Sequence, residues 1–305
     1  MRRWPARRGA PLNTFDIRFV SCAAPAVPDL DTPVLVDSLV ASGARVDVAD
    51  WRDSSVDWSN ATVTMLRSPW DYVHHLDEFI AWAERASTTS ELWNPLALLR
   101  WNTHKSYLLD LQARGAPIVP TVVLLAGSAA SLDAICDAQG WNAVVVKPAI
   151  ASGGDGARRG DVGDVTLQAH LDTLLEQGEV LVQPYVEAVE RDGEVSVVLL
   201  DGRFSHALRK RPAAGDYRVQ EHHGGTTELV DPSPGVIELA ERVCGVLPTP
   251  TLYARIDLVS LGERWHVIEA EVTEPSLWLD LAPADATRQL AAGLLARVAS
   301  AGARG

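Results

Sequence analysis

The chain has 305 residues, 47% of them hydrophobic and 22% charged, which is the composition of a soluble globular protein with room for two or three lobes. Its net charge of −13 argues against nonspecific binding to nucleic acid or anionic membranes, and no apolar run reaches the roughly 18 residues that a membrane span requires. The three cysteines are widely spaced and form no CxxC pattern, so we expect a reducing, cytoplasmic location.

The first third of the chain predicts a small α/β domain. Residues 1–14 are basic but have no apolar segment after them, so we expect a disordered or non-native tail rather than a signal peptide. The patterns then predict, in order, a strand at 15–22, a helix capped by Thr32 and ending at Gly43, strands at 44–51 and 61–68, and a helix at 75–87. This βαββα order favours one α/β domain over residues 15–100.

The third predicted strand ends in Arg67-Ser68-Pro69-Trp70-Asp71. Ligands tend to lie at the carboxyl ends of strands in open α/β sheets, where Arg67 could bind a carboxylate bidentately and Trp70 could line a pocket. The alternative is a loop that is fixed by a tryptophan packed on the core and by an Arg–Asp pair. The sequence leaves both interpretations open.

Two lysines and a glycine-rich segment come next. Asn102 or Thr103 is predicted to cap a helix over 104–114, which places Lys105 in a first turn where the helix dipole disfavours a cation unless an anion binds there. Lys147 interrupts an apolar strand, where an amine requires a partner. The three glycines of residues 151–157 could place backbone amides around phosphate oxygens, so we interpret this segment as a flap over a triphosphate, although such a segment alone is more often a turn.

Two further strands carry polar candidates. In the strand at 179–187, Gln183 and the backbone around Tyr185 and Val186 could contact a purine edge, and Glu187 could reach a ribose hydroxyl. Residues 194–212 predict a hairpin that turns at Asp201-Gly202 and ends in the basic cluster 209–211. A solvated edge strand, on which Lys and Arg prevent aggregation, is the alternative explanation of that cluster.

The most informative stretch is 253–279. Two alternating runs flank Gly262-Glu263-Arg264, which predicts a hairpin with a three-residue turn, with Asp257 opposite Glu269 and Arg255 opposite Glu271. The other, buried face then holds Ile256, Leu258, Ile268, Ala270 and Val272. Three carboxylates on one face repel one another unless a cation joins them, and oxygen ligands of this kind suit Mg²⁺ or Mn²⁺. The alternative is a solvated face with an Arg255–Glu271 ion pair.

In this order, Lys105, VVVKP, SGGDG, VQPYVE, the basic strand, YARID and VIEAEVTEPSL resemble the ATP-grasp superfamily over about residues 94–300, in the group of glutathione synthetase and the ribosomal-protein glutamate ligase. In length and layout the chain also resembles the cyclo-ligases that close O-ureido-serine to D-cycloserine. The resemblance implies an α/β (α+β) ATP-grasp fold, in which two lobes clasp ATP. Its parts would be the N-terminal domain at 15–100, a central lobe with the flap at 101–182, and a C-terminal lobe with the metal site at 183–305.

The resemblance also implies site residues. Those predicted to contact ATP are Lys105, Lys147, Ser152, Gly153, Gly154, Gly156, Gln183, Tyr185 and Val186, with Glu187 at the ribose. Asp257, Glu269 and Glu271 would bind two Mg²⁺ ions, with Mn²⁺ as the alternative, and Arg255, Lys147 and Arg209 would act in catalysis. Outside the shared motifs, our candidate substrate contacts are Arg67, Trp70, Asp71 and Ser276. Glu271 departs from the family, which commonly has Asn there, and its extra charge would alter metal or γ-phosphate binding.

The implied reaction is ATP- and Mg²⁺-dependent formation of a C–N bond through an acylphosphate, on a small amino-acid-like carboxylate. The most specific expectation is cyclisation of O-ureido-D-serine to D-cycloserine, a step of antibiotic biosynthesis. Another ligase of the glutathione synthetase type, or a nucleotide-binding protein without turnover, is the alternative. We expect no nucleic-acid or membrane partner, and the resemblance suggests a homodimer. The first strand is not followed by GxGxxG, which argues against a dinucleotide-dependent oxidoreductase.

Overall fold

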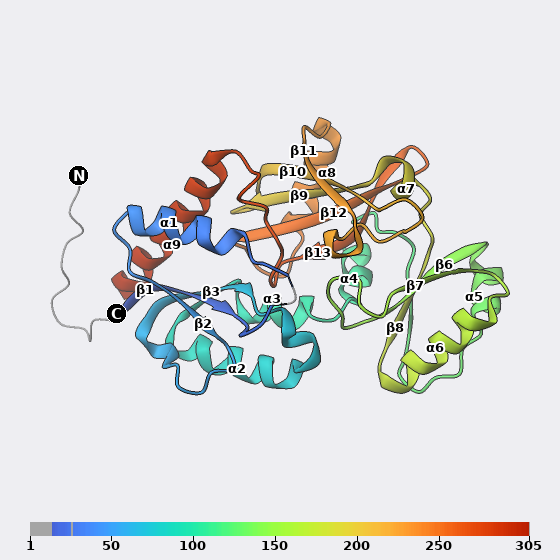
Figure 1. Cartoon of the computed structure of the whole chain (residues 1–305), viewed down its shortest axis with the longest axis horizontal. Coiled ribbons are helices and arrows are strands. Elements are labelled where there is room, and N and C mark those ends of the chain that lie inside the picture. The colour runs from blue at the N-terminus through green and yellow to red at the C-terminus, as the bar shows by residue number, and fades with distance from the viewer. Residues whose placement is uncertain (1–13, 26, 305) are drawn as a thin grey trace. The chain divides into compact units, whose positions relative to one another are not determined.

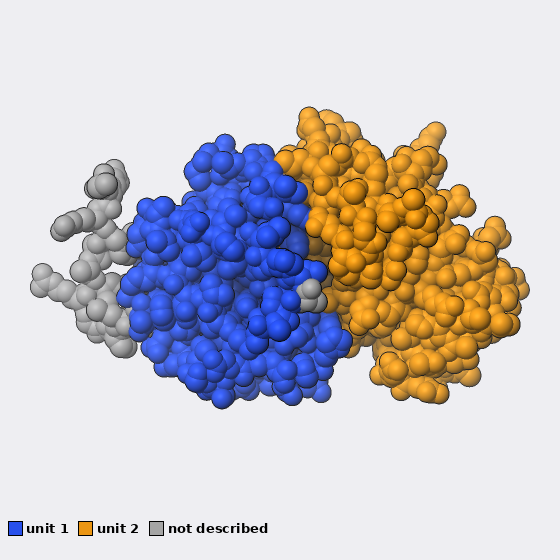
Figure 2. Space-filling view, viewed as in Figure 1, with its two compact units in different colours: residues 1–96, 276–305 blue, residues 97–275 orange. Residues whose placement is uncertain are grey.

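The computed structural model describes residues 14–25 and 27–304, and its contacts divide the chain into two compact units (Figure 2). Unit 1 comprises residues 1–96 and 276–305, and unit 2 comprises residues 97–275. The predicted tail at 1–14 lies outside the described residues, apart from Thr14. None of the helices within the described ranges is long and apolar enough to cross a membrane.

Unit 1 is built on a parallel sheet with the strand order β2-β1-β3-β4. Figure 1 labels β1, β2 and β3 of this sheet. Its elements are β1 Phe15–Ser21, α1 Asp31–Ala41, β2 Val46–Asp50, the 3-10 turns Trp58–Asn60 and Trp70–His74, β3 Ala61–Ser68, α2 Leu76–Thr89, β4 Glu91–Trp93 and α9 Ala284–Arg304. The predicted βαββα order is confirmed. Thr32 is not the cap of α1, because the side chain of Asp29 accepts hydrogen bonds from the amides of Asp31 and Thr32, both at 3.1 Å.

The C-terminal helix, α9, belongs to unit 1. Helix α9 packs on α1, β3 and β1, and Leu290, Leu294 and Val298 are among its buried residues. The contacts therefore group residues 276–305 with the N-terminal segment, whereas the sequence led us to place 183–305 in one lobe.

Unit 2 contains two antiparallel sheets, with the orders β5-β8-β6-β7 and β11-β10-β9-β12-β13. The elements up to the end of the first sheet are α3 Leu96–Asn102, α4 Tyr107–Ala113, β5 Val122–Leu124, α5 Leu132–Gln139, β6 Ala143–Pro148, β7 Arg158–Asp161, α6 Val165–Gln177 and β8 Val180–Pro184. Those that follow are α7 Ala188–Asp192, β9 Glu194–Leu200, β10 Arg203–Arg211, a 3-10 turn at Glu221–His223, β11 Thr226–Val230, α8 Pro234–Gly245, β12 Tyr253–Leu261 and β13 Arg264–Glu271.

Strand alternation gives each sheet of unit 2 one core face and one face that can carry polar groups. Val144, Val146, Val180 and Val182 of the first sheet are buried together with residues of α5 and α6. Lys147 and Gln183 lie at alternate positions, so they share the other face. In the second sheet, Val195, Val197, Ile256 and Leu258 pack with the buried face of α8. The opposite face of that sheet holds the candidate site.

Candidate active site

The hairpin β12–β13 pairs Asp257 with Glu269 and Arg255 with Glu271, as predicted, but for a different reason. The turn has two central residues rather than three, because Leu261 pairs with Arg264, and Gly262 adopts a φ of +63°. A β-bulge between Asp257 and Leu258 adds the missing residue and restores the register. The bulge also explains one error: Val267 takes the place predicted for Ile268 in the core, and Ile268 packs with Val259 and Val186 instead.

Three carboxylates converge where this register places them. Asp257, Glu269 and Glu271 each offer an oxygen within 4.8 Å of the others. Arg255 Nη2 lies 3.0 Å from Asp257 Oδ2 and also pairs with Glu271, while Lys105 pairs with Glu269. The structure therefore brings Lys105, Arg255 and the three predicted metal ligands into one cluster.

Lys105 reaches the cluster from a loop, not from a helix. The predicted helix at 104–114 is wrong at its start, since α3 ends at Asn102 and α4 begins only at Tyr107. Asn102 does not cap a helix because its carboxamide bonds the edge of β13, with Nδ2 donating to Ala270 O (2.7 Å) and Oδ1 accepting from Val272 N (2.9 Å). The amide of Lys105 in turn donates to Ala149 O at 2.8 Å, which ties this loop to the end of the strand that carries Lys147.

Glu194 and Lys210 belong to the same face, although the sequence did not single them out. They are paired across β9 and β10, form an ion pair, and Lys210 Nζ also lies 3.2 Å from Asp257 Oδ2. A regular hairpin from Asp201-Gly202 would put Arg209 opposite Glu194, but a bulge between Phe204 and His206 shifts the register by one. Arg209 is thereby placed opposite Val195, on the core face, and the structure does not bring it to the carboxylates.

Burial and charge set the ionisation of this cluster. Burial alone would raise the pKa of Asp257, but Arg255 and Lys210 outweigh it, so the pKa falls and the carboxylate stays ionised. Burial raises the pKa of Glu194 to about 7 despite its pairing with Lys210. Burial also lowers the pKa of Lys147 to about 8, although Glu269 opposes that shift. The site thus holds one carboxylate and one amine that titrate close to neutral pH.

The residues predicted for the adenine and ribose differ in exposure. Gln183 is buried, and its amide donates to Thr121 Oγ1 at 2.9 Å. Val186 is buried in a cluster with Val119, Val189, Val219 and Val259. The ring of Tyr185 lies 4.2 Å below the guanidinium of Arg159, and its hydroxyl bonds Glu190. Glu187 is exposed just before α7.

The predicted flap, residues 151–157, is a tight turn in left-handed backbone. Gly153, Gly154 and Gly156 have φ values of +61°, +79° and +68°, which only glycine adopts at little cost. At Gly156 a Cβ would also lie 2.7 Å from Pro148 Cγ. The carbonyl oxygen of Ser152 accepts a hydrogen bond from the backbone amide of Asp155 at 3.0 Å. The glycines are therefore required by the backbone of this turn.

The candidate substrate residues lie in unit 1. Arg67 is 0% exposed, and its Nη2 lies 2.8 Å from Asp31 Oδ2, so ion pairing is seen where the sequence left two interpretations open. Asp31 also accepts the amides of Leu277 and Leu279, both at 2.7 Å, and Trp278 between them has a φ of +50°. Asp71 accepts from Trp51 Nε1 at 2.7 Å, and Trp70 and Ser276 are half-buried. Their contacts with a substrate stay a prediction.

The charges of the cluster fit a nucleotide with divalent cations. Four carboxylates face four cationic side chains, namely Asp257, Glu269, Glu271 and Glu194 with Lys105, Lys147, Lys210 and Arg255. Because these cationic side chains already interact with carboxylates, an incoming triphosphate would bring further negative charge, which Mg²⁺ would offset. Asp257, Glu269 and Glu271 are the residues that would hold it, since their oxygens converge.

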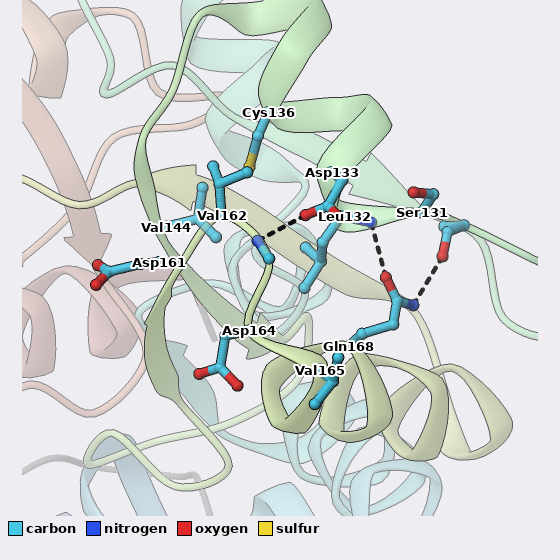
Figure 3. Close-up of a pocket in the computed structure, with 12 residues that line it drawn as sticks. Ser131, Leu132, Asp133, Cys136, Val144, Asp161, Val162, Asp164, Val165 and Gln168 are labelled. Atoms are coloured by element: carbon cyan, nitrogen blue, oxygen red, sulfur yellow. Dashed lines mark hydrogen bonds between the residues drawn. The ribbon is translucent and has the colours of Figure 1, made fainter.

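A separate pocket of about 290 Å³ lies between α5, β7 and α6 (Figure 3). Its acidic side chains have structural partners, because Asp133 accepts the amide of Gly163 at 2.8 Å and Asp164 caps α6 through Thr166 N at 2.8 Å. No predicted site residue lines this pocket.

Comparison with known proteins gives concordant results. Residues 17–94 match a family described as "D-cycloserine synthetase DcsG, N-terminal domain", and residues 113–282 match "Prokaryotic glutathione synthetase, ATP-grasp domain". The cycloserine biosynthesis protein DcsG of Streptomyces lavendulae is 34% identical over 278 residues, covering 85% of this chain and 91% of that protein.

Solved structures agree with these matches. The crystal structure of D-cycloserine synthetase DcsG has a TM-score of 0.85 and 31% identity, over 92% of this chain and 99% of that one. The ATP-grasp ligase PsnB, solved with a variant of its minimal precursor, Mg and ADP, has a TM-score of 0.65 over 94% of this chain and 100% of that one, and its 17% identity shows a shared fold. The chain therefore belongs to the ATP-grasp ligases, ATP-dependent enzymes that form C–N bonds, and within them to the family of DcsG.

Proposed function

We propose that the protein cyclises O-ureido-D-serine to D-cycloserine, with ATP and two Mg²⁺ ions, through an acylphosphate. The observation that carries the chemistry is the convergence of Asp257, Glu269 and Glu271 with Lys105 and Arg255 on one sheet face. The substrate rests on the relatives, because DcsG matches both along the sequence and in structure.

The proposed reaction has two steps. A carboxylate oxygen of the substrate attacks the γ-phosphorus, the bond to the β-phosphate oxygen breaks, and ADP leaves. The oxygen-linked nitrogen of the same molecule then attacks the acyl carbon, the ring closes, and phosphate leaves. D-Cycloserine lacks the carbamoyl group of the substrate, so that group must also leave, with one water, as carbon dioxide and ammonia.

The side chains of the cluster have distinct parts in this scheme. Lys105, Lys147 and the amides of the flap would bind the phosphates, and Mg²⁺ held by Asp257, Glu269 and Glu271 would supply charge stabilisation to the transferred phosphoryl group. Arg255 is held in place by Asp257 and Glu271, so its guanidinium is oriented before any substrate binds. Lys210, which contacts the same Asp257 oxygen as Arg255, also helps to keep that carboxylate ionised.

The test is ADP release by the purified protein with MgATP and O-ureido-D-serine, with products identified by mass spectrometry. Formation of D-cycloserine with one ADP per ring would support the proposal, and O-ureido-L-serine serves as the matched control. ADP release that needs a second amino acid would favour a peptide-forming ligase instead. MgATP binding without ADP release, over a panel of small amino acids, would favour the nucleotide-binding alternative.

We further propose a cytoplasmic homodimer that acts on a small-molecule carboxylate. The three cysteines are all unpaired and buried, which suits a reducing compartment. Light scattering of the purified protein would test the dimer, and a monomer at micromolar concentration would contradict it.

A further inference from the structure

We propose that Tyr217 and His222 are positioning residues that hold the flap (residues 151–157) over the nucleotide phosphates. Both lie in the connection between β10 and β11, residues 212–225. The inference rests on the proposed function in one respect, namely that the flap covers a nucleotide, and it does not depend on the identity of the second substrate.

The connection contacts the flap at three places. Tyr217 Oη donates to Ala157 O at 2.7 Å, at the end of the flap. His222 Nε2 lies 3.1 Å from Gly153 O, where its N–H donates to that carbonyl. Between them, the carboxamide of Gln220 packs on Gly154, since its Oε1 lies 3.3 Å from the position that a Cβ would take there.

The flap requires such support because it has little of its own. Its internal backbone bonds are two turn contacts, from Asp155 N to Ser152 O at 3.0 Å and from Ala157 N to Gly154 O at 3.2 Å. Three of its seven residues are glycines, which have the largest conformational entropy to lose on ordering. Contacts from outside lower that loss at the moment when the flap closes on phosphate.

The connection itself is firmly built. Val219 is buried in the same apolar cluster as Val186, and Arg218 pairs with Asp216 at 2.9 Å. A Cβ at Gly225 would lie 2.3 Å from Val219 O, so the chain folds closely back on itself and only glycine fits. Tyr217 also meets the ring of Tyr185 edge-on, with centroids 6.5 Å apart. The donors are therefore presented from a fixed base.

The connection between β10 and β11 links the flap to the carboxylate cluster. It begins directly after Lys210 and Arg211, so one continuous segment runs from the carboxylate cluster to the flap. A flap that is held in this way would exclude water from the γ-phosphate. A loosened flap would bind ATP more weakly and would let water compete with the substrate carboxylate.

The test uses the full chain and four variants, one of them a control. Tyr217→Phe removes only the hydroxyl donor and keeps the ring, and His222→Ala removes the other donor, with His222→Gln as a variant that retains an N–H. The matched control is His266→Ala, since His266 is half-buried on β13, lies outside the connection and the flap, and has its Nδ1 3.1 Å from Arg264 O. Hydrogen exchange of residues 151–157 with saturating MgATP, the KM for ATP and the ADP-to-product ratio are measured.

We expect Tyr217→Phe and His222→Ala each to raise the KM for ATP about two- to tenfold, as for loss of one hydrogen bond, and to speed exchange in the flap, with kcat changed less. His222→Gln should recover part of the effect, and His266→Ala should show none. Unchanged exchange and unchanged KM in both variants would overturn the inference. If O-ureido-D-serine is not turned over but the variants still weaken MgATP binding and speed flap exchange, the inference stands and the proposed substrate fails.

Discussion

Lys147 shows how a position in a strand determines the chemistry of one residue. Burial lowers the pKa of its amine to about 8, because the charged form loses water that Glu269 and Glu194 replace only in part. An amine with this pKa is charged at neutral pH and becomes neutral in mild base. Any phosphate contact that depends on its charge is then lost.

We therefore predict that ATP affinity falls as pH rises through about 8. The sign follows from the protonated amine being the form that attracts phosphate. Calorimetric titration with MgATP between pH 6.5 and 9.5 would measure this, and Lys147→Arg, which stays charged, should remove the dependence. An equal fall in affinity in the Arg variant would assign the effect to another group.

Glu269 pairs with Lys105 and also lies beside the other two predicted metal ligands, Asp257 and Glu271. Glu269→Gln is expected to lower kcat/KM by about 10²-fold or more, the scale seen when one preorganised electrostatic group is removed. Glu263→Gln, in the turn of the same hairpin, is the control and should keep wild-type rates. Steady-state ADP release measures both, and an active Glu269→Gln would exclude the proposed metal ligand.

Asp31 forms a buried ion pair with Arg67. Asp31→Asn removes one negative partner of a guanidinium that is 0% exposed, and it disturbs the acceptor for the amides of Leu277 and Leu279. We expect a loss of about 3–5 kcal/mol in the free energy of unfolding, as for other broken buried ion pairs. Urea denaturation would measure it, and Asp37→Asn, exposed on the same helix, should change stability by no more than about 0.5 kcal/mol.

At the scale of elements, two β-bulges determine which side chains reach the site. The prediction that Asp257, Glu269 and Glu271 share a face holds because the bulge in the β12–β13 ladder compensates for a turn that is one residue shorter than predicted. The bulge in β10 has no comparable signal in the sequence, so Arg209 was predicted where Lys210 lies. Glu194 was missed for another reason: either register places a basic residue opposite it, but its burial beside Asp257 appears only in the structure.

Two glycines with similar backbone differ in what surrounds them, and this difference gives a prediction. Gly156 and Gly262 have φ values of +68° and +63°, but a Cβ at Gly156 would lie 2.7 Å from Pro148 Cγ, whereas the space beside Gly262 is open. Gly262→Ala should lose about 1–2 kcal/mol of stability from backbone strain alone and keep the wild-type KM for ATP. Gly156→Ala should raise that KM several-fold, because the Cβ displaces the flap or the strand that carries Lys147. Equal kinetic effects in both variants would contradict this reading.

For the whole molecule, the order of elements was predictable and the grouping of the C-terminal helix was not. The chain ends in helix α9, Ala284–Arg304. Which surface that helix covers depends on contacts with β1, β3 and α1, more than 200 residues earlier, and local patterns carry no information at that separation.

A chain that stops after residue 283 should lose the fold of unit 1 and keep that of unit 2. Unit 1 would lose Leu290, Leu294 and Val298 from its core, each of which contributes about 1.5–3 kcal/mol by burial. Unit 2 keeps the carboxylates and lysines, so MgATP should still slow hydrogen exchange at 151–157 while ligation is abolished. Retention of slow exchange in β1 and β3 would show that α9 is not required for unit 1.

Unit 1 consists of two segments from opposite ends of the chain, and this affects how it folds during synthesis on the ribosome. Its sheet emerges first, yet the helix that covers it is made last, after roughly 200 further residues, which takes about 10–40 s at 5–20 residues per second. Unit 2, which is continuous in sequence, can complete its fold within that interval. The nascent sheet must meanwhile keep its apolar surface from other chains, so shielding by a ribosome-associated chaperone would act on the N-terminal third of this protein for most of its translation.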